Sequence, residues 1–533
     1  MSFGPRATIA ICAAIVLTGA IGARVLASAS WNSVVSYHTP YILQPRTPFG
    51  QRLVDHVLLV VIDGLRLDQS RELPEMNTLR AQGADGESRA GLPSLSNPAR
   101  AVFSTGSWQE VNGVTNNSAY IPPKGRSVFS NANAVGIRVA FAGIDFWKQN
   151  YGMYAREDFP SFGKEPHDLG VDAISAYQRK LCGGIVPFVG ASQARLIVVD
   201  LTAVDIISHD FGAVTPEAKR IRGEVDSCLQ QVVAKVDLAK TVVIVTSDHG
   251  HLDTGGHGGE EEEVMRTPLV IAGQGVRRAS GIRAEQVDIA PTICGLLGIP
   301  IPSMNQGRFL AEAFDFPPAT IQEVQDRVEQ QRAMFHRVQQ RILGGDRAGA
   351  PLRARSLRLG PAVALALCIA VGVGWILAGA CHTTRERGEL FLATMLYNGV
   401  YYALFRNFHL AYSLSAVNRE EFLNAFLFKG MLVSALATAL LGAAVAVTRE
   451  RTVTDRVRLF AAFAALISLT WMAQVLRIYY LNGITITAWM FDLTQAFTCY
   501  LDLLALIGVA VGGVAGALLL WAIASLLPKP ASL

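Results

Sequence analysis

The sequence predicts two architectures in one chain: an α/β domain whose mainly parallel sheet is flanked by helices, and an all-α transmembrane domain. Three observations predict them. Short runs rich in valine and isoleucine recur between residues 55 and 310, long apolar segments crowd into the last third, and another apolar run lies near the amino terminus. We therefore divide the chain into residues 1–28, 29–316, 317–346 and 347–533.

The composition excludes two classes of protein. Of the 533 residues, 51% are apolar and only 17% are charged, which is too apolar for a large, purely soluble enzyme. The net charge of +4 supplies no basic surface for nucleic acid, so nucleic-acid binding is not expected. The sequence points to no particular protein partner.

Residues 1–28 are expected to be a transmembrane anchor. The apolar run 7–27 follows Arg6, and about 20 such residues suffice to cross the hydrocarbon core. A signal peptide is the alternative, but the run is longer than the usual apolar part of one, which favours a retained anchor.

The carboxyl-terminal part, residues 347–533, is expected to cross the membrane about five more times. The apolar segments are 359–380, 390–415, 423–447, 459–480 and 497–525. Arginine-rich short loops favour the cytoplasmic side. These arginines are Arg385, Arg387, Arg449, Arg451, Arg456 and Arg458.

This orientation places residues 29–316 on the extracytoplasmic side. The alanine- and arginine-rich composition is typical of a bacterial protein, so the side would be the periplasm or the exterior of a plasma membrane. Three arginines depart from the rule that positive charges lie on the cytoplasmic side. Arg353, Arg355 and Arg358 precede the second predicted span on its outer side.

Residues 317–346 are expected to form an amphipathic connecting helix. Thr320 and Glu323 form a capping box, and apolar residues then repeat at spacings of three and four up to Gly344. The helix either packs on the outer domain or the membrane surface, or pairs with a second copy as a coiled coil.

Three of the seven cysteines, Cys182, Cys228 and Cys294, lie in the polar part of the chain. If this part is extracytoplasmic, one disulfide can form there. The sequence favours no particular pairing.

Five short apolar runs predict strands buried on both faces, as in a parallel sheet. The runs are 57–62, 139–142, 196–199, 242–245 and 269–272. Ligands of such sheets bind at the carboxyl ends of the strands. Asp63 follows the first strand and Asp248 follows the fourth, so we expect the chemistry there.

Four of the ten histidines, His209, His249, His251 and His257, lie within one short stretch, together with Asp205 and Asp248. Imidazole and carboxylate suit zinc, and two zinc ions about 3.5–4 Å apart can act on one phosphoryl group. The glycines around His257 allow a close backbone approach.

Ser96 is the expected nucleophile. Pro98 favours a helix that starts at Ser96, which leaves free backbone N–H groups and the positive end of the helix dipole beside its hydroxyl. Taken alone, such a stretch is more commonly a helix cap. The neighbouring metal cluster favours the catalytic interpretation.

Five motifs in this order resemble the alkaline phosphatase superfamily over residues 55–310, and the last two resemble the glycosylphosphatidylinositol (GPI) ethanolamine phosphate transferases. The motifs are VVIDGLR (60–66), PSLSNPARAVFSTG (93–106), DIISH (205–209), TSDHGHLDTGGHGG (246–259) and DIAPTICGLLGIPIPSMNQGR (288–308). The resemblance implies an alkaline-phosphatase-like fold, two zinc ions and a covalent nucleophile at Ser96. It assigns Asp63, Ser96, Asp248 and His249 to one zinc, and Asp205, His209 and His257 to the other.

The implied activity is phosphoryl transfer from a phosphodiester through phospho-Ser96. We expect a phosphoethanolamine-type transferase with a phospholipid or other lipid-linked donor, and the alternative is a phosphodiesterase or phosphatase that ends with water. Asn97 and Arg100 are expected to contact substrate.

A sulfatase is a further alternative. Residues 96–100 fit the Ser/Cys-x-Pro-x-Arg pattern in which the first residue becomes formylglycine. Sulfatases, however, resemble one another in a paired Asp-Asp after the first strand, where this chain has Asp63-Gly64. A receptor or transporter that has lost activity is disfavoured because all seven ligand positions are filled.

Ionisable residues inside predicted spans are functional candidates. Six of them fall near the outer ends of their helices: Arg406, His409, Lys429, Arg477, Asp492 and Asp502. We expect a polar vestibule in which Arg406, Lys429 and Arg477 bind an anionic lipid headgroup. Alternatively, these side chains only snorkel to the interface.

Overall fold

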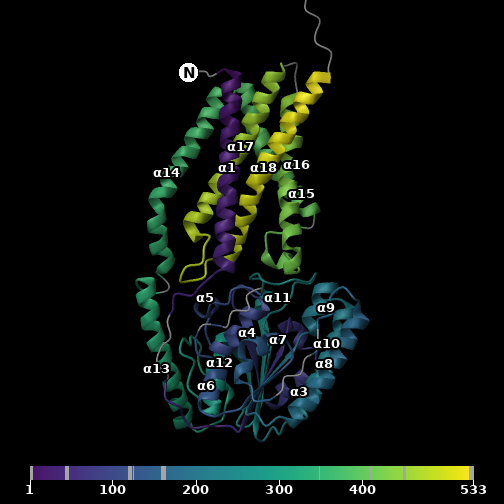
Figure 1. Ribbon diagram of the computed structural model, residues 1–533, viewed down its shortest axis with the longest axis vertical. Coiled ribbons are helices and arrows are strands. Elements are labelled where there is room, and N and C mark those ends of the chain that lie inside the picture. The colour runs from purple at the N-terminus through teal and green to yellow at the C-terminus, as the bar shows by residue number, and fades with distance from the viewer. Residues whose placement is uncertain are drawn as a thin grey trace, which may run out of the picture.

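The protein has two parts stacked along its longest axis, a helical bundle and an α/β domain (Figure 1). The computed structural model describes residues 4–41, 47–117, 123, 125–157, 162, 164–346, 349–408, 410–447 and 452–526. The chain starts in the bundle with α1 (Pro5–Val35), builds the α/β domain, and returns to the bundle from α14 (Ala350–Gly379) onward. His409, Arg449 and Arg451 lie outside the described residues.

A seven-stranded sheet in the order β3-β4-β1-β5-β6-β2-β7 forms the centre of the α/β domain. The strands are β1 (His56–Ile62), β2 (Ala84–Arg89), β3 (Val139–Ala142), β4 (Leu196–Leu201), β5 (Thr241–Thr246), β6 (Arg266–Gly273) and β7 (Ala279–Glu285). Strands β3, β4, β1 and β5 are parallel, whereas β6 runs antiparallel to both of its neighbours. The prediction of a mainly parallel sheet is confirmed, with one reversed strand.

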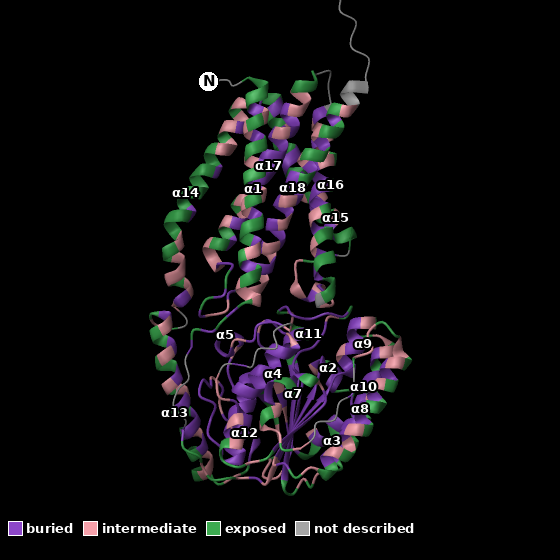
Figure 2. Ribbon diagram, viewed as in Figure 1, coloured by how far each residue is buried: buried purple, intermediate pink, exposed green. Residues whose placement is uncertain are grey.

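Alternate residues of β1 enter two separate cores, which is why the strand is apolar throughout. Leu58 and Val60 face α3, α8, α9 and α10, whereas Leu59 and Val61 face α4, α6, α7, α12 and α13. Both cores are buried in Figure 2. The helices of the first face are α3 (Pro74–Gln82), α8 (Val171–Ala191), α9 (Ala203–Phe211) and α10 (Pro216–Val233). The helices of the second face are α4 (Ser96–Thr105), α6 (Val128–Ala134), α7 (Asp145–Tyr151), α12 (Ile289–Leu297) and α13 (Pro318–Leu343). Among its described residues, the α/β domain also contains three helices of a single turn, which are α2 (Leu67–Ser70), α5 (Gln109–Asn112) and α11 (Glu262–Met265).

A disulfide joins Cys182 of α8 to Cys228 of α10, with Cα atoms 5.7 Å apart. It links two neighbouring helices on one face of the sheet. Cys294 is buried in α12 as a free thiol. The structure thus selects one of the pairings that the sequence left open.

Helix α13 packs on the α/β domain. Val324 and Val328 join the core beneath the sheet, and Arg327 donates a hydrogen bond of 2.9 Å to the carbonyl of Ile299. The predicted capping box is wrong, because the helix begins at Pro318 without a side-chain cap and Thr320 already lies in its first turn.

The bundle contains α1, α14, α15 (Thr384–Asn407), α16 (Leu423–Val447), α17 (Val453–Asn482) and α18 (Leu493–Leu526). Five helices among the described residues are long and apolar enough to cross a membrane: α1, α14, α16, α17 and α18. Helix α15 is not among them. It covers part of the predicted span 390–415 but ends at Asn407, and its first turns carry charged side chains.

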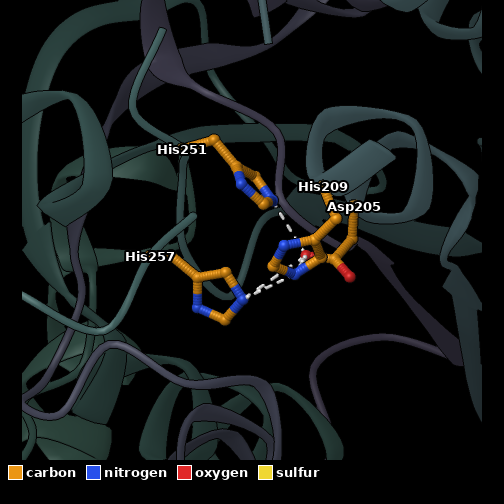
Figure 3. Close-up of side chains that lie close together, drawn as sticks. All are labelled: Asp205, His209, His251 and His257. Atoms are coloured by element: carbon orange, nitrogen blue, oxygen red, sulfur yellow. Dashed lines mark hydrogen bonds and ion pairs between the residues drawn. The ribbon is translucent and has the colours of Figure 1, made fainter. Parts of the chain in front are cut away.

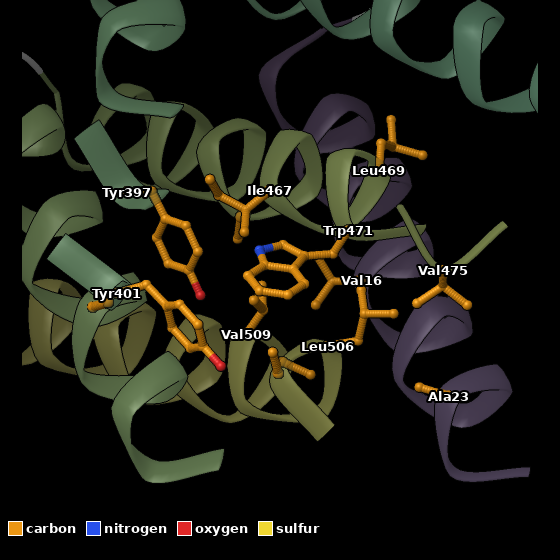
Figure 4. Packing of buried hydrophobic residues seen from close by; sticks show 14 of the residues in the cluster. Val16, Ala23, Tyr397, Tyr401, Ile467, Leu469, Trp471, Val475, Leu506 and Val509 are labelled. Carbon is orange, nitrogen blue, oxygen red and sulfur yellow. The ribbon is translucent and has the colours of Figure 1, made fainter. Parts of the chain in front are cut away.

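Helix α17 lies at the centre of the bundle and α14 at its edge. In the most apolar window, 67% of the α17 residues but only 17% of the α14 residues are buried. Around Trp471 of α17 pack aromatic and aliphatic side chains from α1, α15 and α18 (Figure 4). The bundle is therefore a packed core of its own.

Two of the three arginines that depart from the charge rule cap the carboxyl terminus of α17, whereas Arg353 donates a hydrogen bond of 3.1 Å to the carbonyl of Leu343 at the end of α13. Arg355 donates a hydrogen bond of 2.6 Å to the carbonyl of Leu481, and Arg358 donates one of 3.1 Å to that of Tyr479. The last carbonyls of a helix lack partners within the helix and carry its negative dipole end. Local contacts thus hold these arginines in place in the first turns of α14.

Candidate active site and metal centre

The candidate site lies at the carboxyl ends of the central strands, on the side of the sheet that faces the bundle (Figure 1). Asp63 follows β1, Asp205 lies in α9 just after β4, and Asp248 follows β5. Parallel strands end at the same edge of a sheet, so residues far apart in the sequence meet there.

The first cluster is formed by Asp205, His209, His251 and His257 (Figure 3). Oδ1 of Asp205 lies 3.3 Å from Nε2 of His209 and 3.6 Å from Nε2 of His257. The two imidazole Nε2 atoms are 3.1 Å apart. Three metal-binding atoms thus converge on one point, as a tetrahedral zinc site requires.

The second cluster is formed by Asp63, Asp248, His249 and Ser96. Nε2 of His249 lies 3.0 Å from Oγ of Ser96 and 3.6 Å from a carboxylate oxygen of each aspartate. These two oxygens, Oδ1 of Asp63 and Oδ2 of Asp248, are buried and accept no hydrogen bond from any described residue. Because a buried carboxylate oxygen needs a partner, this donor set fits a cation.

The hydrogen bonds of the imidazoles separate candidate ligands from supporting residues. Nδ1 of His257 donates to the carbonyl of Ser94 at 2.8 Å, and Nδ1 of His249 donates to that of Gly250 at 3.1 Å. With the proton on Nδ1, Nε2 keeps a lone pair for a metal.

His251 has the opposite tautomer. Its Nδ1 accepts a hydrogen bond of 3.1 Å from the backbone N–H of Gly256, so its Nε2 carries the proton and donates to Asp205 at 2.8 Å. Although its atoms lie in the cluster, His251 therefore orients Asp205 and does not offer a lone pair. The sequence showed this histidine without indicating its role.

The charges of the site also favour a cation. Burial raises the pKa of Asp63 well above its ordinary value, and the carboxylates of Asp248 and Asp205 raise it further. Burial, and then the neighbouring His249 and His209, hold the pKa of His257 well below its ordinary value, so its imidazole is neutral at pH 7. A cation bound between these groups would offset the repulsion between the carboxylates of Asp63, Asp248 and Asp205.

Arg100 lies buried beside the site and binds two of the aspartates. Its guanidinium is 1% exposed, contacts Asp63, and donates to Asp200 at 2.8 Å. Trp147 donates to the same Asp200 carboxylate at 2.8 Å. Asp200 is not among the residues predicted from the sequence, although an aspartate inside the apolar strand LIVVDL is a signal. Arg100 thus positions Asp63, besides lining the cavity.

Ser96 is the first residue of α4, which confirms the predicted helix start. The side chain of its neighbour Asn97 lines the cavity but donates to the carbonyl of Asn117 at 2.8 Å. The serine hydroxyl therefore lies at the positive end of the helix, beside the buried carboxylates and His249.

A cavity of about 410 Å³ opens over Ser96 between the α/β domain and the bundle. Its floor contains Asp63, Ser96, Asp205, His209 and His257. Its opposite wall comes from the bundle side: Trp31 and Val34 of α1, the 414–423 segment, and Ile486, Met490 and Leu493. Glu165 and His167 lie at its side.

The predicted basic vestibule does not meet this cavity. Arg406, Lys429 and Arg477 are exposed on α15, α16 and α17, and none of them lines the cavity over Ser96. Arg477 lines a separate cavity between α14 and α17. Asp492 is exposed, whereas Asp502 is buried and accepts a hydrogen bond of 2.9 Å from Gln474.

Two family models match the α/β domain. Residues 57–150 match type I phosphodiesterase / nucleotide pyrophosphatase, and residues 220–299 match sulfatase. One solved structure similar to the chain is alkaline phosphatase PafA, with 11% identity, a TM-score of 0.40, and coverage of 50% of this chain and 100% of that one.

Curated relatives are similar over the same region. Human GPI ethanolamine phosphate transferase 3, catalytic subunit, is 27% identical over 195 residues, which is 35% of this chain and 17% of that protein. Mouse GPI ethanolamine phosphate transferase 1 is 26% identical over 310 residues, which is 49% of this chain and 33% of that protein. The matches thus span a third or less of these relatives. Together with the order of the motifs, the family matches and these relatives support the alkaline phosphatase superfamily, in the branch of the GPI ethanolamine phosphate transferases, as the family of the α/β domain, and the five long apolar helices are consistent with a membrane domain.

Proposed function

We propose that the protein is a metal-dependent phosphotransferase that moves a phosphoethanolamine-type group from a lipid donor through phospho-Ser96. One observation carries this proposal: the cavity over Ser96 has residues of both candidate metal clusters in its floor and apolar side chains from the bundle side in its opposite wall. Such a cavity suits a substrate with a phosphodiester headgroup and an apolar tail.

The two clusters would hold two metal ions. Asp63, Ser96, Asp248 and His249 would bind one, and Asp205, His209 and His257 the other. Imidazole and carboxylate ligands favour zinc. When bound, such ions lower the pKa of an attacking hydroxyl and neutralise negative charge on phosphate oxygens.

The residues of the chain would act in two steps. Ser96 Oγ attacks phosphorus, its bond to phosphorus forms as the bond to the leaving alkoxide breaks, and the serine proton ends on the leaving alcohol. An acceptor hydroxyl then displaces Ser96, which regains a proton. The amino terminus of α4 stabilises the negative charge of the phosphoryl group, and Arg100 keeps Asp63 in place.

The disulfide between Cys182 and Cys228 supports an extracytoplasmic α/β domain, since disulfides persist in oxidising compartments. The bundle supports the same topology. Helix α14 runs away from the α/β domain (Figure 1), so the start of α15, which carries Arg385 and Arg387, lies at the far end of the bundle, as expected for a cytoplasmic segment.

The structure disfavours the sulfatase alternative. Gly64 has φ +75°, and a Cβ atom there would lie 2.8 Å from Nε2 of His251 and 2.9 Å from Cα of Asp205. A second aspartate after Asp63 would therefore displace the first cluster. Transfer to water differs from transfer to an acceptor only in the second step, so a phosphodiesterase remains the second candidate.

The test uses the full-length protein in lipid nanodiscs with phosphatidylethanolamine radiolabelled in its ethanolamine. We expect label attached covalently to the wild type and absent from Ser96→Ala. Label that then leaves only when a hydroxyl acceptor is added indicates a transferase, and steady release of free phosphoethanolamine indicates a phosphodiesterase. A metal-loaded protein that never becomes labelled, or formylglycine at position 96, would contradict the proposal.

A further inference from the structure

We propose that the loop between α15 and α16 completes the metal centre, with Asn418 as a positioning residue for His209. The inference rests on the proposed function only in assuming that the Asp205 cluster binds a metal. It assigns a role to the membrane part of the chain beyond anchoring.

The Asn418 side chain holds His209 at two points. Its Nδ2 donates a hydrogen bond of 2.6 Å to the backbone carbonyl of His209, and its Oδ1 accepts one of 2.9 Å from Nδ1 of the same residue. A carbonyl only accepts, so the amide nitrogen must face it and the amide oxygen must face the ring. This arrangement keeps the proton on Nδ1 and leaves the Nε2 lone pair for a metal.

Asn418 thus does for His209 what backbone carbonyls do for His249 and His257. In those two histidines, the carbonyls of Gly250 and Ser94 fix the tautomer from within the α/β domain. Only His209, among these three candidate ligands, takes its orienting acceptor from the bundle side of the molecule.

Further contacts hold the loop in place. Ser415 Oγ accepts a hydrogen bond of 2.9 Å from the N–H of Gly259 and donates one of 2.6 Å to Glu261. Arg419 donates two hydrogen bonds, of 2.8 and 2.9 Å, to Asp168. The loop therefore docks on the α/β domain on both sides of Asn418.

The glycines around His257 make this docking possible. A Cβ atom on Gly256 would lie 2.2 Å from the carbonyl oxygen of Ser415, and one on Gly259 would lie 2.8 Å from its Oγ. Gly255 and Gly256 also have positive φ angles. The GGHGG stretch thus admits a segment from the bundle side against the metal cluster.

The other end of the loop is fixed in the bundle. Tyr412 donates a hydrogen bond of 3.0 Å to the hydroxyl of Tyr401 in α15, and Tyr401 packs against Trp471 at a centroid distance of 5.1 Å. The loop therefore joins the core of the bundle to a metal ligand.

The test compares metal binding by the full-length wild type, Asn418→Ala and Ser413→Ala in detergent. Ser413→Ala is the matched control because it removes a contact of the same loop with Glu261 but touches no candidate ligand. Competition with a chelator gives the zinc dissociation constants, and the visible spectrum of the Co²⁺-loaded protein reports the ligand set. Circular dichroism checks the fold of each variant.

We expect Asn418→Ala to weaken one of the two metal positions about 10- to 100-fold and to change the Co²⁺ spectrum, with Ser413→Ala close to the wild type. Equal metal binding by Asn418→Ala and the wild type would overturn the inference and leave the proposed function standing. So would an equal loss in both variants, since that loss would come from loop docking. A wild type that binds no metal would overturn the proposed function itself.

Discussion

At the scale of single residues, the site depends on where protons sit on its imidazoles. Nε2–H of His251 donates to Asp205, whereas the lone pairs on Nε2 of His249 and His257 face the clusters. Four histidines close together in a sequence therefore do not imply four ligands. Sequence spacing shows that such histidines can meet, but only their hydrogen-bond partners decide which nitrogen is free.

His251→Ala should weaken metal binding without abolishing it. Because His251 only supports Asp205, we expect a loss of about 10- to 100-fold in metal affinity. His257→Ala removes a ligand and should empty one position at the same metal concentration. Elemental analysis of both purified variants tests this, and identical metal contents would contradict the distinction.

Metal retention should decrease as the pH falls. Ligands must be deprotonated to bind a metal, so protons compete with it. Burial by itself would lower the pKa of His209, but Asp205 and the hydrogen bond to Asn418 raise this pKa above its ordinary value of 6.5. The pKa of Asp63 is raised as well, mainly because the carboxyl group is buried. Both groups therefore take up protons at a higher pH than a free histidine or aspartate side chain would. Zinc remaining after dialysis at pH 8 and pH 5, with circular dichroism as the folding control, measures the effect.

At the scale of elements, the sequence predicted the strands that are buried on both faces and missed those that are not. Strands β2 (ADGESR) and β7 (ASGIRAE) alternate between buried and exposed positions and carry charged side chains. Their order in the sheet depends on pairing between segments that are far apart in the chain, since β2 pairs with β6 and β7 pairs with β2. Local sequence patterns do not contain that information.

Removal of the disulfide should destabilise α8 and α10 without changing the site. The bond closes a loop with a sequence separation of 46 residues, for which loop entropy predicts about 4 kcal/mol of stabilisation. The variant Cys182→Ser/Cys228→Ser should therefore unfold at a lower temperature, with metal content unchanged at room temperature. Differential scanning calorimetry measures the shift, and an unchanged unfolding temperature would contradict it.

At the scale of the whole molecule, the sequence predicted both parts and the residues of each cluster, but not how the parts meet. The expected lipid contacts were charges on the bundle, Arg406, Lys429 and Arg477, and the structure leaves them away from the cavity. Apolar side chains such as Trp31 and Met490 form the wall instead. Single apolar residues near a helix end or in a connecting segment do not stand out in a sequence, so their role becomes visible only in three dimensions.

Substitutions in this wall should separate lipid binding from chemistry. Trp31→Ala and Met490→Ala remove apolar surface that faces Ser96 across the cavity. We expect kcat/KM for a long-chain lipid donor to fall about 10-fold or more, since each buried large apolar side chain contributes roughly 1.5–3 kcal/mol. Turnover of a water-soluble aryl phosphodiester should stay near the wild-type value. An equal loss with both substrates would contradict an apolar tail-binding wall.

The hydrogen bond between His209 and Asn418 also has a consequence for biosynthesis. Every candidate ligand lies before residue 260 of the chain, whereas Asn418 is translated only after α14 and α15. The α/β domain can thus be synthesised and fold before Asn418 is present to fix the tautomer of His209. Full metal affinity then arises only after the next hairpin of the bundle has been made, which delays activity until the enzyme is assembled beside its membrane.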